Sequence, residues 1–297
     1  MTEYKEIETT VGNALATAAR RIPGETPRLE AEILLAHILG QSRAWILAHP
    51  EVLLKPGKVA EFDSTLSRLA DGEPLAYITG YREFFGLDFL VTRDVLVPRP
   101  ETELLVEYAL AAIGERRVAG DGPPFTLHAS RFTTIADIGA GSGCIAVSLA
   151  VNLPEASIIA TDISSAALAV ARANAARHGV AERIDFKQGD LLDPIAGPVD
   201  LLCANLPYID SDELSALTVA RNEPRLALDG GIGGTELVER FLAAAPGSLN
   251  PGGMLLLEIG ATQAEAVSAT ARAAFPGATV EIHKDLASLP RLVSIHL

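Results

Sequence analysis

Residues 137–143 read Asp-Ile-Gly-Ala-Gly-Ser-Gly, and this stretch decides the fold. It follows an apolar segment, residues 134–138, that predicts a strand, and it leads into residues 145–151, which predict a helix. Glycines let a backbone pass close to a ligand, and a helix N-terminus offers unpaired N–H groups. The spacing G-x-G-x-G differs from the G-x-G-x-x-G of dinucleotide folds, which disfavours NAD. A Gly-rich turn alone also fits an ordinary tight turn.

The segments around this stretch alternate between strand and helix. Apolar runs predict strands over residues 134–138, 157–161, 184–188, 199–204, 254–258, 279–282 and 292–296, the last two forming a closing hairpin. Helices are predicted between them over residues 145–151, 166–178 and 235–245. Strands that alternate with helices favour a doubly wound, mostly parallel sheet with right-handed crossovers.

The N-terminal part has a different pattern. Apolar residues at helical spacing predict a small helical bundle over residues 1–72, with Gly40 as one helix stop. Residues 73–100 predict a β-hairpin with strands within 77–86 and 87–91, followed by a helix that Pro100 opens. Residues 114–131 contain Gly and Pro and predict an exposed loop. We therefore expect a helical packing or docking domain (1–72), a hairpin linker (73–100) and a main domain (101–297).

Composition narrows the partners. The 297 residues are 48% hydrophobic, enough for a sizeable core, and the net charge is −14. An acidic surface repels nucleic-acid phosphates, so a basic protein or a small molecule fits better than a long duplex. Cys144 and Cys203 lie in apolar segments and predict buried, reduced thiols. We expect no metal site, no signal peptide and no membrane span, and therefore a cytoplasmic protein.

Acidic residues end two further predicted strands. Asp162 follows the second strand, where a carboxylate can accept hydrogen bonds from both ribose hydroxyls, although it could instead cap the next helix. Asp190 follows the third strand and can accept from an adenine amino group, while Leu191 packs on the ring. With Asp137, these make three acidic strand ends in register.

This set resembles the class I S-adenosylmethionine-dependent methyltransferases over residues 133–297. The resemblance implies a Rossmann-like, mostly parallel seven-stranded sheet with a C-terminal antiparallel hairpin. It also implies that the Gly-rich loop cradles the methionine portion, the second-strand acid binds ribose and the third-strand acid contacts adenine. The expected cofactor-binding residues are Asp137, Ile138, Gly139, Ala140, Gly141, Gly143, Asp162, Asp190, Leu191 and Asn205.

A second stretch, Asn205-Leu206-Pro207-Tyr208, follows the strand predicted over residues 199–204. An Asn oxygen and a neighbouring carbonyl can each accept one N–H, so together they can hold a planar –NH2 group under the Tyr ring. The alternative is an ordinary strand-end turn. The stretch resembles the [Asn/Asp]-Pro-Pro-[Tyr/Phe] motif of methyltransferases that act on planar nitrogen. Leu206 departs from that motif, but it keeps the backbone carbonyl and loses only one φ restraint.

The wider pattern resembles the PrmC/HemK family from about residue 27 to the C-terminus. The segments that carry the resemblance are Gly-Glu-Pro-Leu-Ala-Tyr-Ile-Thr-Gly (72–80), Arg-Glu-Phe (82–84), Val-Pro-Arg-Pro-Glu-Thr-Glu (97–103), Asn-Leu-Pro-Tyr-Ile (205–209), Asn-Glu-Pro-Arg (222–225), Pro-Gly-Gly (251–253), Lys-Asp-Leu (284–286) and Leu-Pro-Arg (289–291). Members of that family are protein-(glutamine-N5) methyltransferases, which modify the Gln of the Gly-Gly-Gln loop in class-1 peptide chain release factors.

The resemblance implies a catalytic and substrate-binding set and a mechanism. The set is Asn205, Leu206, Pro207 and Tyr208, with Arg99 and Glu223 as further substrate-binding residues that could instead form ion pairs. The expected mechanism orients the amide nitrogen towards the sulfonium methyl without a dedicated general base. We expect release factors as partners, no stable nucleic acid, no membrane and a monomer. Two alternatives remain, a nucleic-acid adenine-N6 methyltransferase and a non-catalytic cofactor-binding protein.

Overall fold

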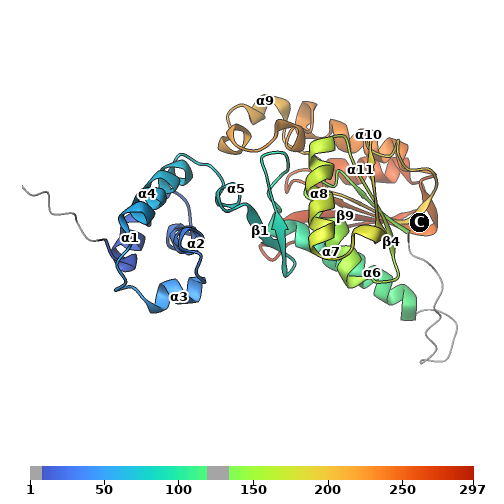
Figure 1. Ribbon diagram of the computed structural model, residues 1–297. Coiled ribbons are helices and arrows are strands. Elements are labelled where there is room, and N and C mark those ends of the chain that lie inside the picture. The colour runs from blue at the N-terminus through green and yellow to red at the C-terminus, as the bar shows by residue number, and fades with distance from the viewer. Residues whose placement is uncertain (1–8, 119–133) are drawn as a thin grey trace, which may run out of the picture. The chain divides into compact units, whose positions relative to one another are not determined.

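The computed structural model describes residues 9–118 and 134–297, and the chain divides into two compact units, residues 1–80 and 81–297 (Figure 1). Because the boundary between the units follows Gly80, the predicted hairpin belongs to the larger unit. The finer division at residues 72 and 100 remains a prediction. Each unit has its own core and is described by itself.

The smaller unit is helical. Its helices are α1 (Val11–Ala18), α2 (Pro27–Leu39), α3 (Arg43–Ala48), α4 (Pro56–Ala70) and α5 (Leu75–Thr79). They share one core of fully buried side chains that includes Leu15, Leu34, Leu35, Ile46 and Leu66. Gly40 ends α2 in a left-handed conformation (φ 63°), which confirms the predicted stop.

One helix of this unit was not predicted individually, and one predicted strand segment is wrong. Helix α3 has only six residues, too few to show a period, and the Ser42 hydroxyl caps it by accepting from the Trp45 N–H. Residues 77–79 were predicted to form part of a strand, because Tyr, Ile and Thr have high strand propensity. They form part of α5 instead. Pro74 precedes the first turn and Gly80 (φ 80°) closes the last, so the flanking residues outweigh that propensity.

The larger unit begins with the hairpin β1 (Tyr81–Phe84) and β2 (Leu87–Leu90), which pair antiparallel as predicted. Two interactions from later elements hold it. The Phe85 N–H donates to Glu103 Oε1 at 2.9 Å, and the Leu90 N–H donates to Asn174 Oδ1 at 2.7 Å. Asn174 Nδ2 also donates to the Ser142 carbonyl at 2.9 Å, so one buried amide joins the hairpin to the Gly-rich stretch.

A seven-stranded sheet forms the body of the larger unit, in the order β5-β4-β3-β6-β7-β9-β8. Its strands are β3 (Thr134–Ile138), β4 (Ser157–Asp162), β5 (Ile184–Gln188), β6 (Val199–Ala204), β7 (Leu249–Glu258), β8 (Thr279–Lys284) and β9 (Pro290–His296). The first five in that order are parallel, while β9 is antiparallel to both neighbours. The expected mostly parallel sheet with a closing hairpin is confirmed.

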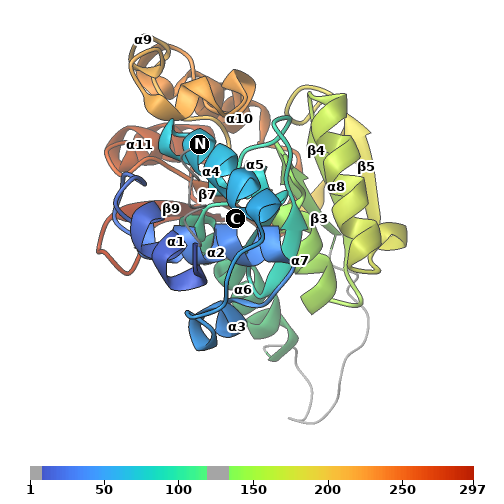
Figure 2. The same ribbon diagram turned by 60° about the vertical axis from the view of Figure 1, so that its left-hand side comes forward.

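Helices cover both faces of this sheet (Figure 1 and Figure 2). One core cluster joins the strands to α6 (Glu103–Val118), α7 (Cys144–Asn152) and α8 (Ser165–Arg177). The other joins them to α10 (Glu236–Ala244) and α11 (Ala264–Ala274). Adjacent residues of one strand serve opposite clusters, as the side-chain alternation of a strand requires: Leu201 belongs to the first and Leu202 to the second.

Helix α6 corrects the predicted loop over residues 114–131. The helix continues through Gly114 to Val118, since Leu105, Val106, Ala109 and Ile113 bury one face and outweigh the roughly 1 kcal/mol cost of an internal glycine. Residues 119–133 of that predicted loop lie outside the described residues.

The connection from β6 to α10 holds short helical turns that the sequence did not predict. They are α9 (Ser211–Leu214), η3 (Thr218–Arg221), η4 (Arg225–Ala227) and η5 (Ile232–Gly234). Each is too short to establish a hydrophobic period. Across residues 9–118 and 134–297, none of the helices has the length and apolar character needed to cross a membrane.

Candidate functional site

The site lies where the parallel strands β3, β4, β6 and β7 end. Parallel strands present their carboxyl ends at one edge of the sheet, which is where open α/β sheets bind ligands. Residues 139–143 follow β3 and residues 205–208 follow β6. We call them the cofactor loop and the substrate loop, after the roles that the sequence predicts for them. The two loops are neighbours, because a Cβ at Gly139 would come within 3.3 Å of the Leu206 side chain.

The cofactor loop is held by the end of β4. The N–H groups of Gly139 and Ala140 both donate to the Thr161 carbonyl, at 2.9 and 2.8 Å, and the Gly141 N–H donates to Asp162 Oδ2 at 2.9 Å. The three glycines of the loop have positive φ angles of 74°, 53° and 78°. L side chains rarely adopt such angles, so the G-x-G-x-G spacing reflects the backbone path of the loop.

Asp137 lies beneath the cofactor loop and is fully buried. Its Oδ2 accepts from the Ala146 N–H at 3.0 Å, while Oδ1 has no hydrogen-bond partner among the described residues. Burial raises the pKa of Asp137 to about 7, against the Ala146 hydrogen bond, and the Asp162 charge raises it further. The neighbouring Ile138 side chain is fully buried in the core, so only its backbone can face a ligand.

Asp162 does not cap α8, which was one of the two roles that the sequence left open for it, and the other role, ribose binding, remains a prediction. Its Oδ1 accepts from the Ser164 N–H at 2.8 Å and its Oδ2 holds the cofactor loop, while the cap of α8 is the Ser164 hydroxyl. Burial raises the pKa of Asp162, and its hydrogen bonds from backbone N–H groups oppose that rise. Each carboxylate oxygen has two lone pairs, so both can still accept from a ligand.

Asp190 and Leu191 follow β5 in an arrangement that the sequence did not predict. Asp190 Oδ2 accepts from Arg240 Nη2 of α10 at 2.5 Å. Leu191 has a positive φ of 46°, and its carbonyl accepts from the Thr161 hydroxyl at 3.1 Å. The expected adenine contact of Asp190 therefore remains a prediction, and an adenine amino group would have to share this carboxylate with Arg240.

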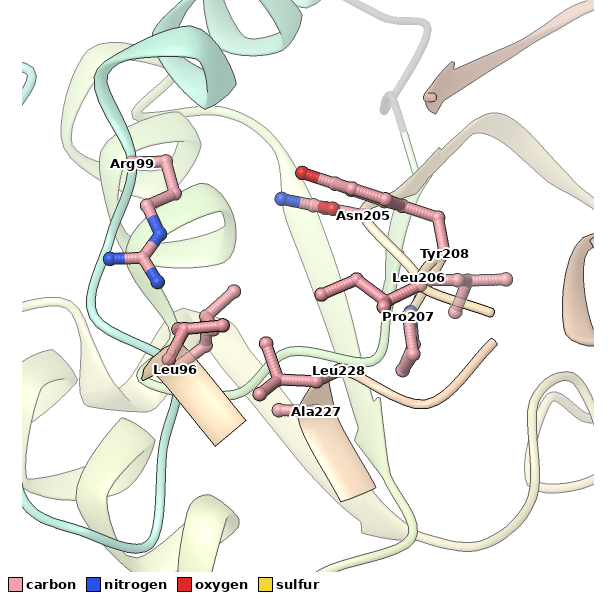
Figure 3. A pocket seen from close by; sticks show the side chains of 10 residues that line it. Leu96, Arg99, Asn205, Leu206, Pro207, Tyr208, Ala227 and Leu228 are labelled. Atoms are coloured by element: carbon pink, nitrogen blue, oxygen red, sulfur yellow. The ribbon is translucent and has the colours of Figure 1, made fainter. Parts of the chain in front are cut away.

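The substrate loop lines a hollow of about 110 Å³ together with Leu96, Arg99, Ile209, Val219, Ala227 and Leu228. Figure 3 shows the Tyr208 ring lying beside the Asn205 side chain, with Arg99 on the opposite wall. The Leu206 side chain is 2% exposed and packs into the second core cluster, which anchors the turn where the motif's proline is missing. The four residues of the predicted catalytic set thus meet at one hollow, and Arg99 joins them there.

The Asn205 side chain is held by a hydrogen bond to Thr102, in the turn before α6. Its Nδ2 donates to Thr102 Oγ1 at 3.0 Å, and no described residue donates to its Oδ1. Hydrogen bonding from Thr102 and Asn205 lowers the pKa of Glu258, the last residue of β7. Burial raises the pKa of Glu258 to about 7, although these two hydrogen bonds and Arg291 favour its charged form.

Residues behind the substrate loop fix its backbone. Gln263 Nε2 donates to the carbonyls of Tyr208, at 3.0 Å, and Gly234, at 2.9 Å. A Cβ at Gly234 would stand 2.4 Å from the Tyr208 carbonyl oxygen, and a Cβ at Gly230 would stand 2.8 Å from the Pro207 carbonyl oxygen. Only glycine fits such approaches. Sequence reasoning missed this support, for which the Gly-Gly-Ile-Gly-Gly run at residues 230–234 was the available signal.

Arg99 and Glu223 form an ion pair, one of the two roles expected for them. Arg99 Nη2 donates to Glu223 Oε1 at 2.5 Å, and the Val97 N–H donates to Glu223 Oε2 at 3.1 Å. Glu223 is 6% exposed and does not line the hollow. It therefore ties the segment before α6 to the segment after η3, while Arg99 alone of the pair faces the hollow.

Comparison with protein families and curated proteins gives a consistent result. The chain matches the family described as PrmC N-terminal domain over residues 13–80 and the family described as Methyltransferase small domain over residues 125–225. It is 46% identical over 269 residues to a release factor glutamine methyltransferase of Moorella thermoacetica, covering 89% of this chain and 90% of that protein. It is 42% identical over 270 residues to one of Cereibacter sphaeroides, covering 90% of each.

Solved structures share the fold over most of the chain. The catalytic domain of hMettl16, in complex with MAT2A 3′UTR hairpin 6, has a TM-score of 0.54 at 15% identity, covering 81% of this chain and 82% of that one. A methyltransferase from Pyrococcus furiosus has a TM-score of 0.50 at 17% identity, covering 72% of this chain and 90% of that one. Identities this low show the fold alone, and they confirm the class I methyltransferase architecture.

Proposed function

The chain belongs to the family of release factor glutamine methyltransferases, and from that membership we propose that it methylates the Gly-Gly-Gln loop of class-1 peptide chain release factors. The methyl group comes from S-adenosyl-L-methionine and goes to the side-chain amide N5 of the loop glutamine. One observation carries the proposal: Asn205 lines a hollow beside the cofactor loop, and no described residue donates to its Oδ1. An amide –NH2 needs such an acceptor.

The residues at the strand ends fit the methyl donor. Asp137 Oδ1 is a buried acceptor without a partner among the described residues, and the cofactor loop is kept free of side chains at its glycines. The cofactor loop and Asp137 would hold the methionine portion, and Asp162 the ribose. When bound, S-adenosyl-L-methionine supplies a methyl group activated by a sulfonium.

The substrate loop would orient the acceptor nitrogen. A carboxamide nitrogen is a poor nucleophile, because its lone pair is delocalised into the carbonyl. Asn205 Oδ1 and the Leu206 carbonyl, to which no described residue donates, would accept the two amide hydrogens. Holding both hydrogens aims the lone pair, and such positioning can supply roughly 7–11 kcal/mol at best.

Tyr208 would cover the amide plane and exclude water. Its ring lies beside the Asn205 side chain (Figure 3), and burial raises the pKa of its hydroxyl, with Glu258 adding to the rise. A neutral phenol keeps its ring apolar above the amide. We propose no general base, because the amide proton can leave after the nitrogen has become cationic.

The nucleic-acid alternative gains nothing specific from the structure. The hMettl16 structure is an RNA complex, but its likeness to this chain lies in the fold alone. The net charge of −14 works against phosphate binding over most of the surface. A protein substrate is therefore the better proposal, and a release factor would be methylated in the cytoplasm by a monomeric enzyme.

One experiment tests the function directly. The protein is incubated with methyl-labelled S-adenosyl-L-methionine and purified class-1 release factors, either wild type or with the loop Gln replaced by Ala. We expect label on the wild-type factor and none on the Ala variant. Label that persists on the Ala variant would refute the glutamine assignment, and label on added RNA would support the alternative.

The helical unit is proposed to dock the release factor outside its Gln loop. Removal of residues 1–72 should then slow methylation of a whole release factor more than methylation of a short Gly-Gly-Gln peptide. Equal losses on the two substrates would end the docking idea. The peptide serves as the internal control for damage to the methyltransferase unit.

A further inference from the structure

Glu258 is a buried carboxyl that the proposed reaction does not use. It ends β7 one residue beyond the last position that pairs with β6, where Leu257 faces Ala204, so it lies beside Asn205. Glu258 is 3% exposed, and its Oε2 has no hydrogen-bond partner among the described residues. A buried carboxyl with an unused oxygen is costly, and such a group is commonly kept for a function.

Thr102 connects this carboxyl to the substrate loop. Thr102 is also 3% exposed, and its Oγ1 accepts from Asn205 Nδ2 at 3.0 Å. Hydrogen bonding from Thr102 and from Asn205 lowers the pKa of the Glu258 carboxyl, so both side chains lie next to it and favour its charged form. Three side chains from the ends of β6 and β7 and the turn before α6 thus form one buried network.

The hydrogen bonds of this network have a fixed order of donors and acceptors when Glu258 is ionised. An asparagine amide has nearly the same shape after a 180° flip, but the flip exchanges its donor and its acceptor. An ionised Glu258 can only accept, so the Thr102 proton points to Glu258 and the Thr102 oxygen must accept from Asn205. That order of donors permits only Nδ2 to face Thr102 and leaves Oδ1 free to accept from another group.

We propose that Glu258, acting through Thr102, is a positioning residue that fixes the Asn205 amide with its Oδ1 towards the substrate. The role deepens the proposed function, on which its kinetic consequence rests. Protonation of Glu258 would abolish this fixed order of donors and acceptors, because a carboxylic acid can donate to Thr102. The Thr102 proton would then be available to Asn205 Oδ1, and the flipped amide would turn its donors towards the substrate.

The charged groups around Glu258 set the pH at which this occurs. Glu101, in the turn before α6, raises the pKa of Glu258, whereas Arg291 of β9 lowers it. The Tyr208 hydroxyl and the Cys144 thiol of α7 also interact with its charge, and both have raised pKa values. With burial as the largest cause, the pKa of Glu258 is about 7, so its two states are both populated near neutral pH.

The first measurement needs no release factor. The protein is labelled with 15N in its asparagine side chains, and the Asn205 pair of amide signals is identified by its loss in Asn205→Asp. We expect these signals to shift between pH 6 and 8 with a midpoint near 7 in the wild type, and to stay fixed in Glu258→Gln. Signals that do not move in the wild type, or that move equally in Glu258→Gln, would overturn the proposal.

The second measurement is single-turnover methyl transfer at saturating cofactor between pH 6 and 9. The wild-type rate should fall about tenfold from pH 8 to 6 as the oriented acceptor is lost, while Glu258→Gln should be about tenfold slower at pH 8 and flat with pH. Asp137 has a similar pKa, so an acid limb that survives in Glu258→Gln belongs to Asp137 and refutes the role of Glu258.

Thr102 variants separate positioning from folding. Thr102→Val keeps the shape of the side chain and removes the link, so the rate at pH 8 should fall about tenfold with an unchanged KM for the cofactor. Thr102→Ser should restore both the rate and the acid limb. Equal rates in Thr102→Val and the wild type would overturn the proposal.

A wild type that labels no release factor would refute the proposed function, while the asparagine signals would still decide the role of Glu258.

Discussion

The cofactor loop and the substrate loop lie at the same edge of one sheet and are held in opposite ways. The cofactor loop is fixed by the next strand along the chain, through Asp162, 21 residues after Gly141. The substrate loop is fixed by distant segments: Thr102 lies 103 residues before Asn205, and Gln263 lies 55 residues after Tyr208. A loop held by its sequence neighbours can be read from the sequence, whereas a loop held by the folded core cannot.

We expect the two loops to have separate functions as well. The cofactor loop would determine the affinity for the methyl donor, and the substrate loop would determine the rate of transfer. A buried carboxyl also lies next to each loop, Asp137 next to the cofactor loop and Glu258 next to the substrate loop. Burial raises the pKa of both carboxyls to about 7. Variants that affect one loop and spare the other test whether this division is real.

The largest effect is expected for Asn205→Ala, which removes the acceptor that we propose for the reacting amide group. The single-turnover rate should fall about a thousandfold, as it does when an oriented polar group is lost from other active sites. The dissociation constant for the cofactor, measured by calorimetry, should stay within about twofold of wild type. Asn152→Ala, on the exposed end of α7, is the control. An undiminished rate would reduce Asn205 to a turn residue.

Glu258→Gln should change the pH dependence of stability. Between pH 4.5 and 7 the folded wild type keeps a proton on Glu258 that the unfolded chain has lost, because the pKa rises from 4.5 to about 7 on folding. The wild type therefore loses stability as pH rises through this window, by about 3 kcal/mol in total. Gln has no such proton, so the stability of the variant relative to wild type should increase from pH 4.5 to 7 and level off above. Urea unfolding measures it, and a difference that is flat with pH would contradict the buried charge.

Gly234→Ala should disturb the substrate loop from behind. Its Cβ would stand 2.4 Å from the Tyr208 carbonyl oxygen, so the loop must shift and transfer should slow about 30-fold. Gly233→Ala is a matched control, since Gly233 also has a positive φ, 65°, but its Cβ would meet nothing within 4 Å. The two variants share the backbone strain and differ in the contact. Equal losses would mean that strain, and not the approach to Tyr208, sets the rate.

The same contrast explains what the sequence could and could not predict. The G-x-G-x-G spacing, the acidic strand ends and the order of strands are local patterns, and the structure bears out the fold that they imply. Residues 77–79 were predicted wrongly as strand, because strand propensity there is outweighed by the neighbouring Pro74 and Gly80.

The support beneath Asn205 had no local signal at Thr102 or Gln263, since both reach the loop only after the sheet has formed. Glu258 could have been found, because it continues the pattern of acidic strand ends to a fourth strand. Arg240 could not, since its pairing with Asp190 depends on where α10 packs.

The smallest effect, on the cofactor loop, completes the comparison. A Cβ at Gly143 would come within 3.0 Å of the Ala171 Cβ of α8, and φ there is 78°. Gly143→Ala should therefore weaken cofactor binding about tenfold, by contact and backbone strain together, and leave the rate at saturating cofactor near wild type. Ala171→Gly added to it removes the 3.0 Å contact with the Ala171 Cβ but neither the 3.2 Å approach to the Ala171 Cα nor the strain, so the double variant should recover part of the affinity. A lower rate at saturating cofactor in Gly143→Ala would show that the loops are coupled through Gly139 and Leu206, and the division between affinity and rate would then fail.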